Sequence, residues 1–292
     1  MRWIGAAIGA TTLLAGCAQE APLVRVGAED YAEQQVVGEM YALMLENNGF
    51  TVERQLDLEE TSSAMAALES GGIDLYPEYT GTALMTVLNL PPSPDPQVVY
   101  DTVQQAYQEQ FELVWLDPSP MNNTQALALT EARADALDLH RLSDFVAQAN
   151  NLVLAGPAEF EVRTDGLPGL RQVYGDFSLG DYRVVDLDRR YQALVSGEAD
   201  VVVAFGTDGE IDALNLVVLE DDRGLFPPYQ IAPVVRQSVV DQYPELATTL
   251  NQLSPLLNDG VMRQVNYQVT GQGRSPEEVA REFLVNSGLI DQ

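Results

Sequence analysis

The chain has 292 residues, enough for two lobes of ordinary domain size, and its 46% of hydrophobic residues excludes wholesale disorder. Its 44 acidic residues outnumber its 15 basic residues, which are all arginines, so it lacks the basic surface that a nucleic-acid-binding protein needs. A single cysteine excludes an intrachain disulfide, and a single histidine argues against a zinc site built from His and Cys.

The N-terminus has the pattern of an export signal. Arg2 precedes an apolar or small stretch, Ile4–Leu14, which is about as long as the apolar region of a signal peptide and too short to span a bilayer. The stretch ends in Leu-Ala-Gly-Cys17, which resembles a bacterial lipobox, the motif whose cysteine is lipidated. We therefore expect a signal peptide over residues 1–16, a lipid on Cys17 and a tether over residues 17–23. The mature protein would be exported and anchored on the periplasmic or outer face of a membrane; a plain signal peptide is the alternative.

Helical and strand patterns alternate from residue 23 onward. Thr61 and Ser62 are predicted to cap a helix that Gly71 ends, and Ser275 is predicted to cap the last helix of the chain. Helices are predicted over 33–47, 61–68 and 98–110 and from Ser275 onward, and strands over 23–26, 50–54, 73–76, 152–155, 201–205, 216–219 and 233–235. The alternation predicts an α/β fold with mainly parallel sheets flanked by helices.

A nine-residue segment recurs within the chain. Residues 67–75 read A-L-E-S-G-G-I-D-L and residues 193–201 read A-L-V-S-G-E-A-D-V, an offset of 126 residues. Each copy has the pattern of a helix end, a glycine, an aspartate and a buried strand, and the same offset relates Tyr79 to Phe205. We interpret the repeat as two similar α/β lobes. Because ligands bind beyond the carboxyl ends of strands in open α/β sheets, two such edges that face each other predict a cleft.

The sequence contains no common catalytic or cofactor motif. It has no G-x-S-x-G elbow, no H-E-x-x-H pair, no G-x-G-x-x-G after a strand and no D-x-D-x-D-G calcium loop. The absence of lysine also excludes Schiff-base chemistry. We therefore expect no catalytic residue, no cofactor and no metal. An exported enzyme that uses two of the many carboxylates is the alternative.

Three aromatic residues adjoin turn-rich breaks. Tyr79 precedes Thr-Gly, Phe205 precedes Gly-Thr, and Tyr229 follows Pro-Pro. Aromatic faces attract ammonium groups, and several rings around one cation form a cage. Core packing is the alternative for each ring taken singly. Together, at the predicted edge of a cleft, the three rings indicate a binding site for a cation.

Several motifs, in this order along the chain, resemble those of one known family. The most specific is D-L-Y-P-E-Y-T-G-T at residues 74–82, which resembles the family's D-[LI]-Y-P-E-Y-T-G-T. G-A-E-D-Y-A-E-Q at 27–34 resembles G-S-K-x-F-T-E-Q, and N-N-T-Q-A-L at 122–127 resembles N-[ND]-T-Y-A-L. From about Val24 onward, the chain is thus similar to the substrate-binding proteins of osmoprotectant ABC importers, which take up glycine betaine, choline and similar quaternary ammonium compounds.

The resemblance implies a periplasmic-binding-protein fold of type II, in which two lobes close on the ligand like a Venus flytrap. Lobe 1 would contain residues 24–122 and 230–292, and lobe 2 residues 123–229. The protein would be a monomer that binds a small solute without chemistry and delivers it to a membrane permease and its ATPase. Tyr79, Phe205 and Tyr229 would be the cage walls.

The resemblance also implies polar contacts. Thr82 would donate to a ligand carboxylate, Arg163 would pair with that carboxylate, and Gln34 would be a polar residue of the pocket. Three positions depart from the family pattern, because Glu29 replaces a lysine, Gln125 replaces an aromatic cage residue, and Phe205 replaces a more usual tyrosine. The ligand therefore stays open between glycine betaine bound weakly, choline, a less usual cationic metabolite such as a betaine of histidine or arginine, and an amino acid or other polar solute.

Overall fold

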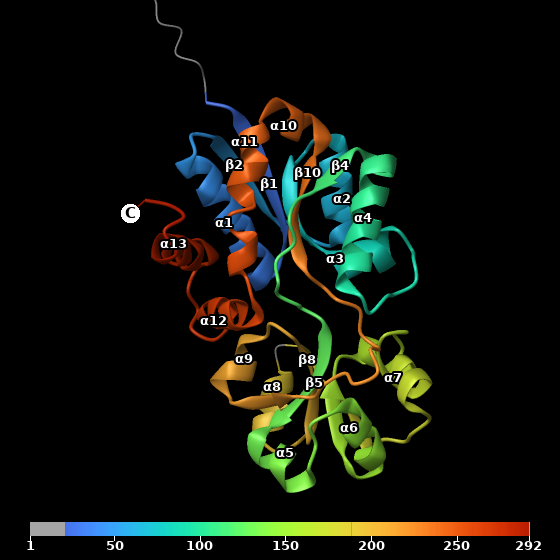
Figure 1. The fold of residues 1–292 in the computed structure, drawn as a ribbon. Coiled ribbons are helices and arrows are strands. Elements are labelled where there is room, and N and C mark those ends of the chain that lie inside the picture. Colours follow the sequence, from blue (N-terminus) through green and yellow to red (C-terminus); the bar gives the residue numbers. More distant parts are fainter. Residues whose placement is uncertain (1–20, 188, 292) are drawn as a thin grey trace, which may run out of the picture.

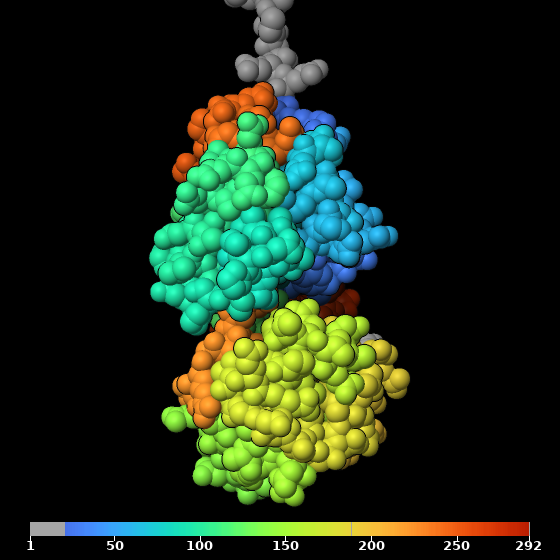
Figure 2. Space-filling model, turned by 90° about the vertical axis from the view of Figure 1, so that its right-hand side faces the viewer, coloured from blue at the N-terminus to red at the C-terminus, as the bar shows by residue number. Residues whose placement is uncertain are grey.

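The computed structural model describes residues 21–187 and 189–291, which form two lobes, each built around a five-stranded sheet (Figure 1). Cys17 and the predicted signal peptide lie outside the described residues. The two bodies meet at a waist, where the orange segment that precedes β10 crosses the surface (Figure 2). The waist is therefore the place at which residues of both lobes come together.

Lobe 1 has a sheet of strand order β2-β1-β3-β10-β4. Its strands are β1 (Leu23–Glu29), β2 (Thr51–Leu58), β3 (Leu75–Tyr79), β4 (Leu113–Trp115) and β10 (Ile231–Arg236). Its helices are α1 (Ala32–Asn47), α2 (Thr61–Ser70), α3 (Thr80–Thr82), α4 (Pro96–Phe111), α10 (Gln237–Gln242), α11 (Pro244–Leu250), α12 (Asp259–Thr270) and α13 (Pro276–Asn286), with a π-helical turn at Ala83–Val87 and a 3₁₀ turn at Ser254–Leu256.

Lobe 2 has a sheet of strand order β7-β6-β8-β5-β9. Its strands are β5 (Gln125–Thr130), β6 (Val153–Gly156), β7 (Asp181–Val184), β8 (Val201–Phe205) and β9 (Leu216–Val218). Its helices are α5 (Glu131–Leu137), α6 (Leu142–Gln148), α7 (Leu167–Tyr174), α8 (Arg190–Val195) and α9 (Gly209–Ala213), with 3₁₀ turns at Ala149–Asn151 and Ala158–Glu161.

The two sheets have the same topology and are mixed rather than purely parallel. β1 pairs in parallel with β2 and β3, and β6 pairs in parallel with β7 and β8. β10 runs antiparallel to β3 and β4, and β5 runs antiparallel to β8 and β9. These two antiparallel strands are the first ones that the chain forms after each passage between sheets. The passages lie between β4 and β5 and between β9 and β10, and the predicted lobe boundaries, 122/123 and 229/230, fall within them.

The repeated segment occupies equivalent places in the two lobes. Residues 67–75 run from α2 into β3, and residues 193–201 run from α8 into β8. β3 and β8 are each the third strand of their sheet, with a parallel neighbour on one side and an antiparallel neighbour on the other. The interpretation of the repeat as two similar α/β lobes is therefore confirmed.

Both faces of each sheet are buried. In β3, Leu75 and Tyr79 belong to the core under α1, α11, α12 and α13, whereas Tyr76 belongs to the core under α2 and α4. In β8, Val201 and Val203 face one core and Val202 and Ala204 the other. A strand that is covered on both sides reads as a continuous apolar run, which is why β8 could be predicted from the sequence. β3 contains Glu78, and the strand predicted over 73–76 shares only Leu75 and Tyr76 with it.

The helix ends agree with the sequence in two cases and differ in one. The Ser275 hydroxyl accepts the backbone N–H of Glu278 at 3.2 Å, and Gly71 ends α2 with a left-handed φ of 78°, so both predictions are confirmed. The prediction that Thr61 and Ser62 cap α2 is wrong. Thr61 is already the first residue of the helix, and its hydroxyl donates to Glu29 at 2.9 Å instead.

In addition to the two chain passages, a contact between two helices joins the lobes. α12, whose apolar face packs in the core of lobe 1, lies against α9 of lobe 2 (Figure 1). The Arg263 guanidinium donates to the carbonyl of Gly206 at 2.9 Å, and the Asn266 amide donates to the carbonyl of Thr207 at 2.9 Å. Gly209 lies so close to α12 that a Cβ there would be 2.6 Å from Tyr267, so the two backbones touch.

Candidate functional site

A cavity of about 850 Å³ lies between the lobes. It is lined by the carboxyl ends of β3 and β8, the first residue of β5, the first turn of α1 and the segment that precedes β10. Since β5 runs antiparallel to β8, its start lies at the same edge, where Gln125 pairs with Phe205. The cavity thus occupies the position at which open α/β sheets bind ligands.

The structure brings six of the eight predicted site residues into the wall of this cavity. They are Tyr79, Thr82, Gln125, Arg163, Phe205 and Tyr229. Tyr79 is buried, and Phe205 and Tyr229 are half-buried. A Cβ on Gly81 would lie 2.8 Å from the ring of Tyr229, so the glycine of the Y-T-G-T motif is what allows this ring to pack beside the end of β3.

The other two predicted residues do not line the cavity. Glu29 is half-buried and accepts the Thr61 hydroxyl, and burial raises the pKa of its carboxyl. Gln34 is fully buried, and its amide donates to the carbonyl of Pro77 at 2.7 Å. Their partners come from α2 and β3, so these side chains are turned into lobe 1 and away from the cavity wall.

The predicted cation of the site is already paired. Arg163 donates from Nε and Nη2 to the two carboxylate oxygens of Asp165 at 2.8 and 2.7 Å. The Gln125 amide donates to the same carboxylate at 2.6 Å. The hydrogen bond with Asp165 raises the pKa of Arg163, so the guanidinium stays charged. A ligand carboxylate would therefore share this corner with Asp165 rather than meet a free guanidinium.

A second guanidinium lines the wall in lobe 2. Arg190 is buried, and its Nη2 donates to Asp208 at 2.5 Å, while the Tyr191 hydroxyl and the Phe205 N–H donate to the same oxygen at 2.5 and 2.7 Å. The guanidinium carbon lies 4.6 Å from the centre of the Tyr191 ring and 5.6 Å from that of Phe205. One face of Phe205, a predicted cage wall, is thus already in contact with a cation of the protein.

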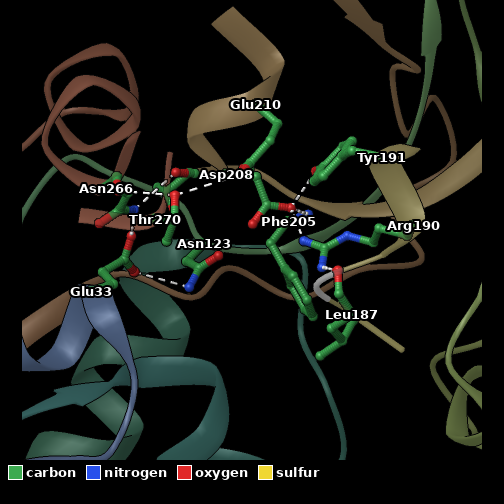
Figure 3. Close-up of polar contacts among 12 residues, drawn as sticks. Glu33, Asn123, Leu187, Arg190, Tyr191, Phe205, Asp208, Glu210, Asn266 and Thr270 are labelled. Atoms are coloured by element: carbon green, nitrogen blue, oxygen red, sulfur yellow. Dashed lines mark hydrogen bonds and ion pairs between the residues drawn. The ribbon is translucent and has the colours of Figure 1, made fainter. Parts of the chain in front are cut away.

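A buried carboxylate lines the wall in lobe 1. Glu33, in the first turn of α1, is 5% exposed and accepts the Tyr79 hydroxyl at 2.6 Å and the Asn123 amide at 2.9 Å through one oxygen. Its other oxygen accepts the Asn266 amide at 2.5 Å. Figure 3 shows Glu33 and Asn123 on one side of the site and Arg190 and Tyr191 on the other. Burial raises the pKa of Glu33, and hydrogen bonds from Thr207, Tyr79 and Asn266 oppose that rise.

Several wall residues have no predicted role from the sequence. They include Tyr31, Glu33, Asn123, Glu159, Phe160, Arg190, Tyr191, Asp208, Glu210, Asn266 and Thr270. Position offers a signal for some of them, since Glu33 lies in the first turn of the helix that follows β1, and Asp208 lies three residues after the end of β8. Asn266 carries no such signal, because it reaches Glu33 from α12, 233 residues further along the chain.

The described residues hold no cluster of His, Cys, Asp and Glu that could bind a metal ion. Over residues 21–187 and 189–291, each helix is too short or too polar to cross a membrane. The chemistry that the wall offers is therefore recognition by rings, carboxylates, guanidinium groups and amides.

Relatives of known name agree with this description. The chain is 34% identical over 287 residues to the glycine-betaine-binding protein of Pseudomonas aeruginosa, a match that covers 95% of this chain and 91% of that protein. It is also 34% identical over 272 residues to the ergothioneine transport permease/ergothioneine binding protein EgtU of Helicobacter pylori. That match covers 93% of this chain but 48% of the relative, so the chain spans about half of that protein's length.

The fold also agrees with that of a solved relative. A crystal structure of a glycine betaine/carnitine/choline ABC transporter superimposes with a TM-score of 0.85 at 30% identity, covering 92% of this chain and all of that one. The model of the substrate binding domain of ABC-type glycine betaine transport systems matches residues 22–286. The protein is thus a transport component with the two-lobed fold of periplasmic binding proteins, not an enzyme, and it belongs to the family of substrate-binding domains of ABC-type glycine betaine transport systems.

Proposed function

We propose that this protein captures a quaternary ammonium solute in the cavity between its lobes and delivers it to an ABC permease. The observation that carries the proposal is the wall itself: Tyr79, Tyr229 and Phe205 converge on one cavity together with the buried carboxylate of Glu33. Aromatic faces and a carboxylate both attract an ammonium group, and neither requires the ligand to offer a hydrogen-bond donor. The names of the relatives, which refer to glycine betaine and ergothioneine, support this class of ligand.

The cavity is large enough for ligands bigger than glycine betaine, and its wall has donors for a carboxylate. Its volume of about 850 Å³ is toward the upper end of the range for small-molecule sites, roughly 300–1,000 Å³. Thr82 and Arg163, which also line the cavity, provide donors for a ligand carboxylate. Glycine betaine, carnitine, choline and ergothioneine are therefore the four solutes to compare.

Isothermal titration of the purified mature chain with these four compounds tests the proposal. We expect saturable binding of at least one of them with a stoichiometry of one ligand per chain. The absence of binding to all four by protein whose circular dichroism shows a folded α/β protein would reject the ligand class. Mass spectrometry of small molecules that co-purify with the protein then identifies a ligand outside the panel.

A second candidate keeps the site and changes the ligand to an amino acid or another polar solute. It rests on the corner where Gln125 and Arg163 meet on Asp165, which offers hydrogen bonds where the family has an aromatic ring. A thermal-shift screen that contains the common amino acids and the four quaternary ammonium compounds separates the two candidates. Stabilisation by an amino acid alone would favour the second.

We further propose that the protein acts outside the cytoplasmic membrane, held there by a lipid on Cys17. The lipobox that ends an apolar stretch supports this location, as does the family, whose members are extracytoplasmic components of ABC importers. Labelling of cells with a radioactive fatty acid tests the anchor. We expect incorporation into the natural chain and none into Cys17→Ser, which should appear in the soluble fraction instead.

A further inference from the structure

The charged groups in the cavity wall differ in one respect, which is whether they have a counter-ion. Arg163 pairs with Asp165 and Arg190 pairs with Asp208, so both wall guanidinium groups are neutralised by carboxylates. Glu33 is different. The hydrogen-bond partners of Glu33 are two hydroxyls, of Tyr79 and Thr207, and two amides, and the described residues contain no ion pair between Glu33 and an arginine or histidine.

The surroundings of Glu33 show that its charge faces the site. Tyr79, whose hydroxyl donates to it, is one of the wall aromatics, and Asn123 and Asn266 are wall residues as well. A carboxylate buried without a counter-ion is costly, and a cation that enters the cavity supplies the missing charge. The hydrogen bond from the Tyr79 hydroxyl to an anion also leaves more electron density on the Tyr79 ring, which strengthens its attraction for a cation.

We propose that Glu33 is the specificity-determining residue for the charge of the ligand: its uncompensated carboxylate, acting directly and through Tyr79, makes the cavity select a positively charged headgroup over a neutral one of the same shape. This inference rests on the proposed function and deepens it. The aromatic rings alone would accept any bulky apolar group, whereas the carboxylate distinguishes an ammonium nitrogen from a carbon atom. It also orients the ligand, with its ammonium group on the lobe-1 side and any carboxylate toward Arg163.

The test compares ligands that differ only in this charge. Choline is paired with 3,3-dimethylbutan-1-ol and glycine betaine with 3,3-dimethylbutanoate, in which a carbon atom replaces the nitrogen. The ratio of dissociation constants within a pair measures charge selection, because shape and apolar area are shared. We expect the natural chain to prefer the ammonium compound, and Glu33→Gln to lower that preference on the order of tenfold.

Two further variants separate charge from structure. Glu33→Asp keeps the charge and should retain most of the preference. Glu39→Gln is the matched control, because Glu39 is a buried glutamate of the same helix that pairs with Arg54 and does not line the cavity; its ratio should equal that of the natural chain. The ratio is unaffected by a general loss of affinity, so a purely structural role of Glu33 would weaken both members of a pair alike.

The outcomes distinguish the inference from the function on which it rests. If the natural chain binds no quaternary ammonium compound, the proposed function fails. If it binds one but Glu33→Gln leaves the preference over the neutral isostere unchanged, the function stands and the role of Glu33 is overturned. A preference that falls in Glu33→Gln and persists in Glu33→Asp supports the inference.

Discussion

The two lobes share one topology, but the charged groups beside their equivalent strand ends differ. β3 ends in Tyr79, whose hydroxyl donates to the uncompensated carboxylate of Glu33. β8 ends in Phe205, which has no hydroxyl and lies against the Arg190 guanidinium, itself paired with Asp208. Lobe 2 thus pairs the buried charge of its wall, Arg190, with Asp208, whereas lobe 1 leaves the buried carboxylate of Glu33 without a counter-ion. The shared topology thus fixes the positions of the two rings, whereas the charged groups around each ring determine which ligand group it attracts.

The same contrast extends one residue back along each strand. The offset of 126 that relates Tyr79 to Phe205 relates Glu78 to Ala204. Glu78 is fully buried, accepts the Tyr76 hydroxyl and the Tyr79 N–H at 2.6 Å each, and has no ion pair among the described residues. Lobe 1 therefore buries a carboxyl group at a position where lobe 2 has an apolar side chain, and four measurements can test the contrast between the lobes.

The largest effect is expected from breaking the balanced pair of lobe 2. Asp208→Ala leaves the buried Arg190 without its counter-ion, so we expect a loss of about 3–5 kcal/mol in the free energy of unfolding. Chemical denaturation followed by circular dichroism measures it. Asp212→Ala is the control, because Asp212 pairs with Arg263 at 3.3 Å on the surface and should cost less than about 1 kcal/mol. Equal losses in the two variants would show that the Arg190 pair is not a buried charge balance.

The buried carboxylate of β3 should make stability depend on pH. Burial raises the pKa of Glu78 from 4.5 to about 8, so the folded protein keeps a proton that the unfolded chain loses. Its contribution is complete below pH 4.5 and is lost as pH rises through 8, with a slope of about −1.4 kcal/mol per pH unit between these values. The difference between the natural chain and Glu78→Gln isolates this slope. A difference that is flat from pH 5 to 9 would contradict it.

The two equivalent rings should contribute unequally to binding. We expect Tyr79→Ala to weaken binding of a quaternary ammonium ligand by about 1–2 kcal/mol, the range of a partly desolvated cation–π contact. Phe205→Ala should cost less, since one face of Phe205 already contacts Arg190. Titration calorimetry of both variants, with thermal unfolding to show that each remains folded, checks the order. A larger loss for Phe205→Ala would reverse the assignment of the ammonium group to the lobe-1 side.

The smallest effect is a pH dependence of binding. Burial raises the pKa of Glu33, and the groups that face it are the hydroxyls of Thr207 and Tyr79, the amides of Asn123 and Asn266, and the carboxylate of Asp208, which adds to the rise. Protonation removes the negative charge, so the affinity for a cationic headgroup should fall as pH is lowered through this pKa, by less than about tenfold. The neutral isostere should show no such fall, nor should Glu33→Gln.

Much of this fold could be predicted because short patterns in the sequence mark the central strands of both sheets. The apolar run of β8 and the repeat that spans α2–β3 and α8–β8 are visible in the sequence, and they place Tyr79 and Phe205 at strand ends. The sheets are predicted as mainly parallel, and in each of them one strand, β10 or β5, runs antiparallel to its neighbours. The direction of β5 and β10 follows from how the chain passes between lobes, which no local pattern encodes.

The wall could be predicted where a motif or an aromatic residue beside a turn marks it, as at Phe205 and Tyr229. The Y-P-E-Y-T-G-T run contributes Tyr79 and Thr82, but the significance of Glu33 depends on Asn123 and Asn266, which reach it from distant segments. Glu29 and Gln34 belong to the same motif, residues 27–34, as Glu33. Their side chains hydrogen-bond to α2 and β3 instead and do not line the cavity. Spacing indicates which residues are near an edge; it does not indicate which of them lack a counter-ion.

The most direct test of the account is a crystal structure of the protein with the quaternary ammonium compound that binds most tightly. We expect the ligand in the cavity between the lobes, with its nitrogen within about 6 Å of the Tyr79 ring centre and nearer to Glu33 than to Arg190. A ligand bound outside the cavity, or one whose ammonium group lies against the lobe-2 wall with Glu33 turned away, would contradict it.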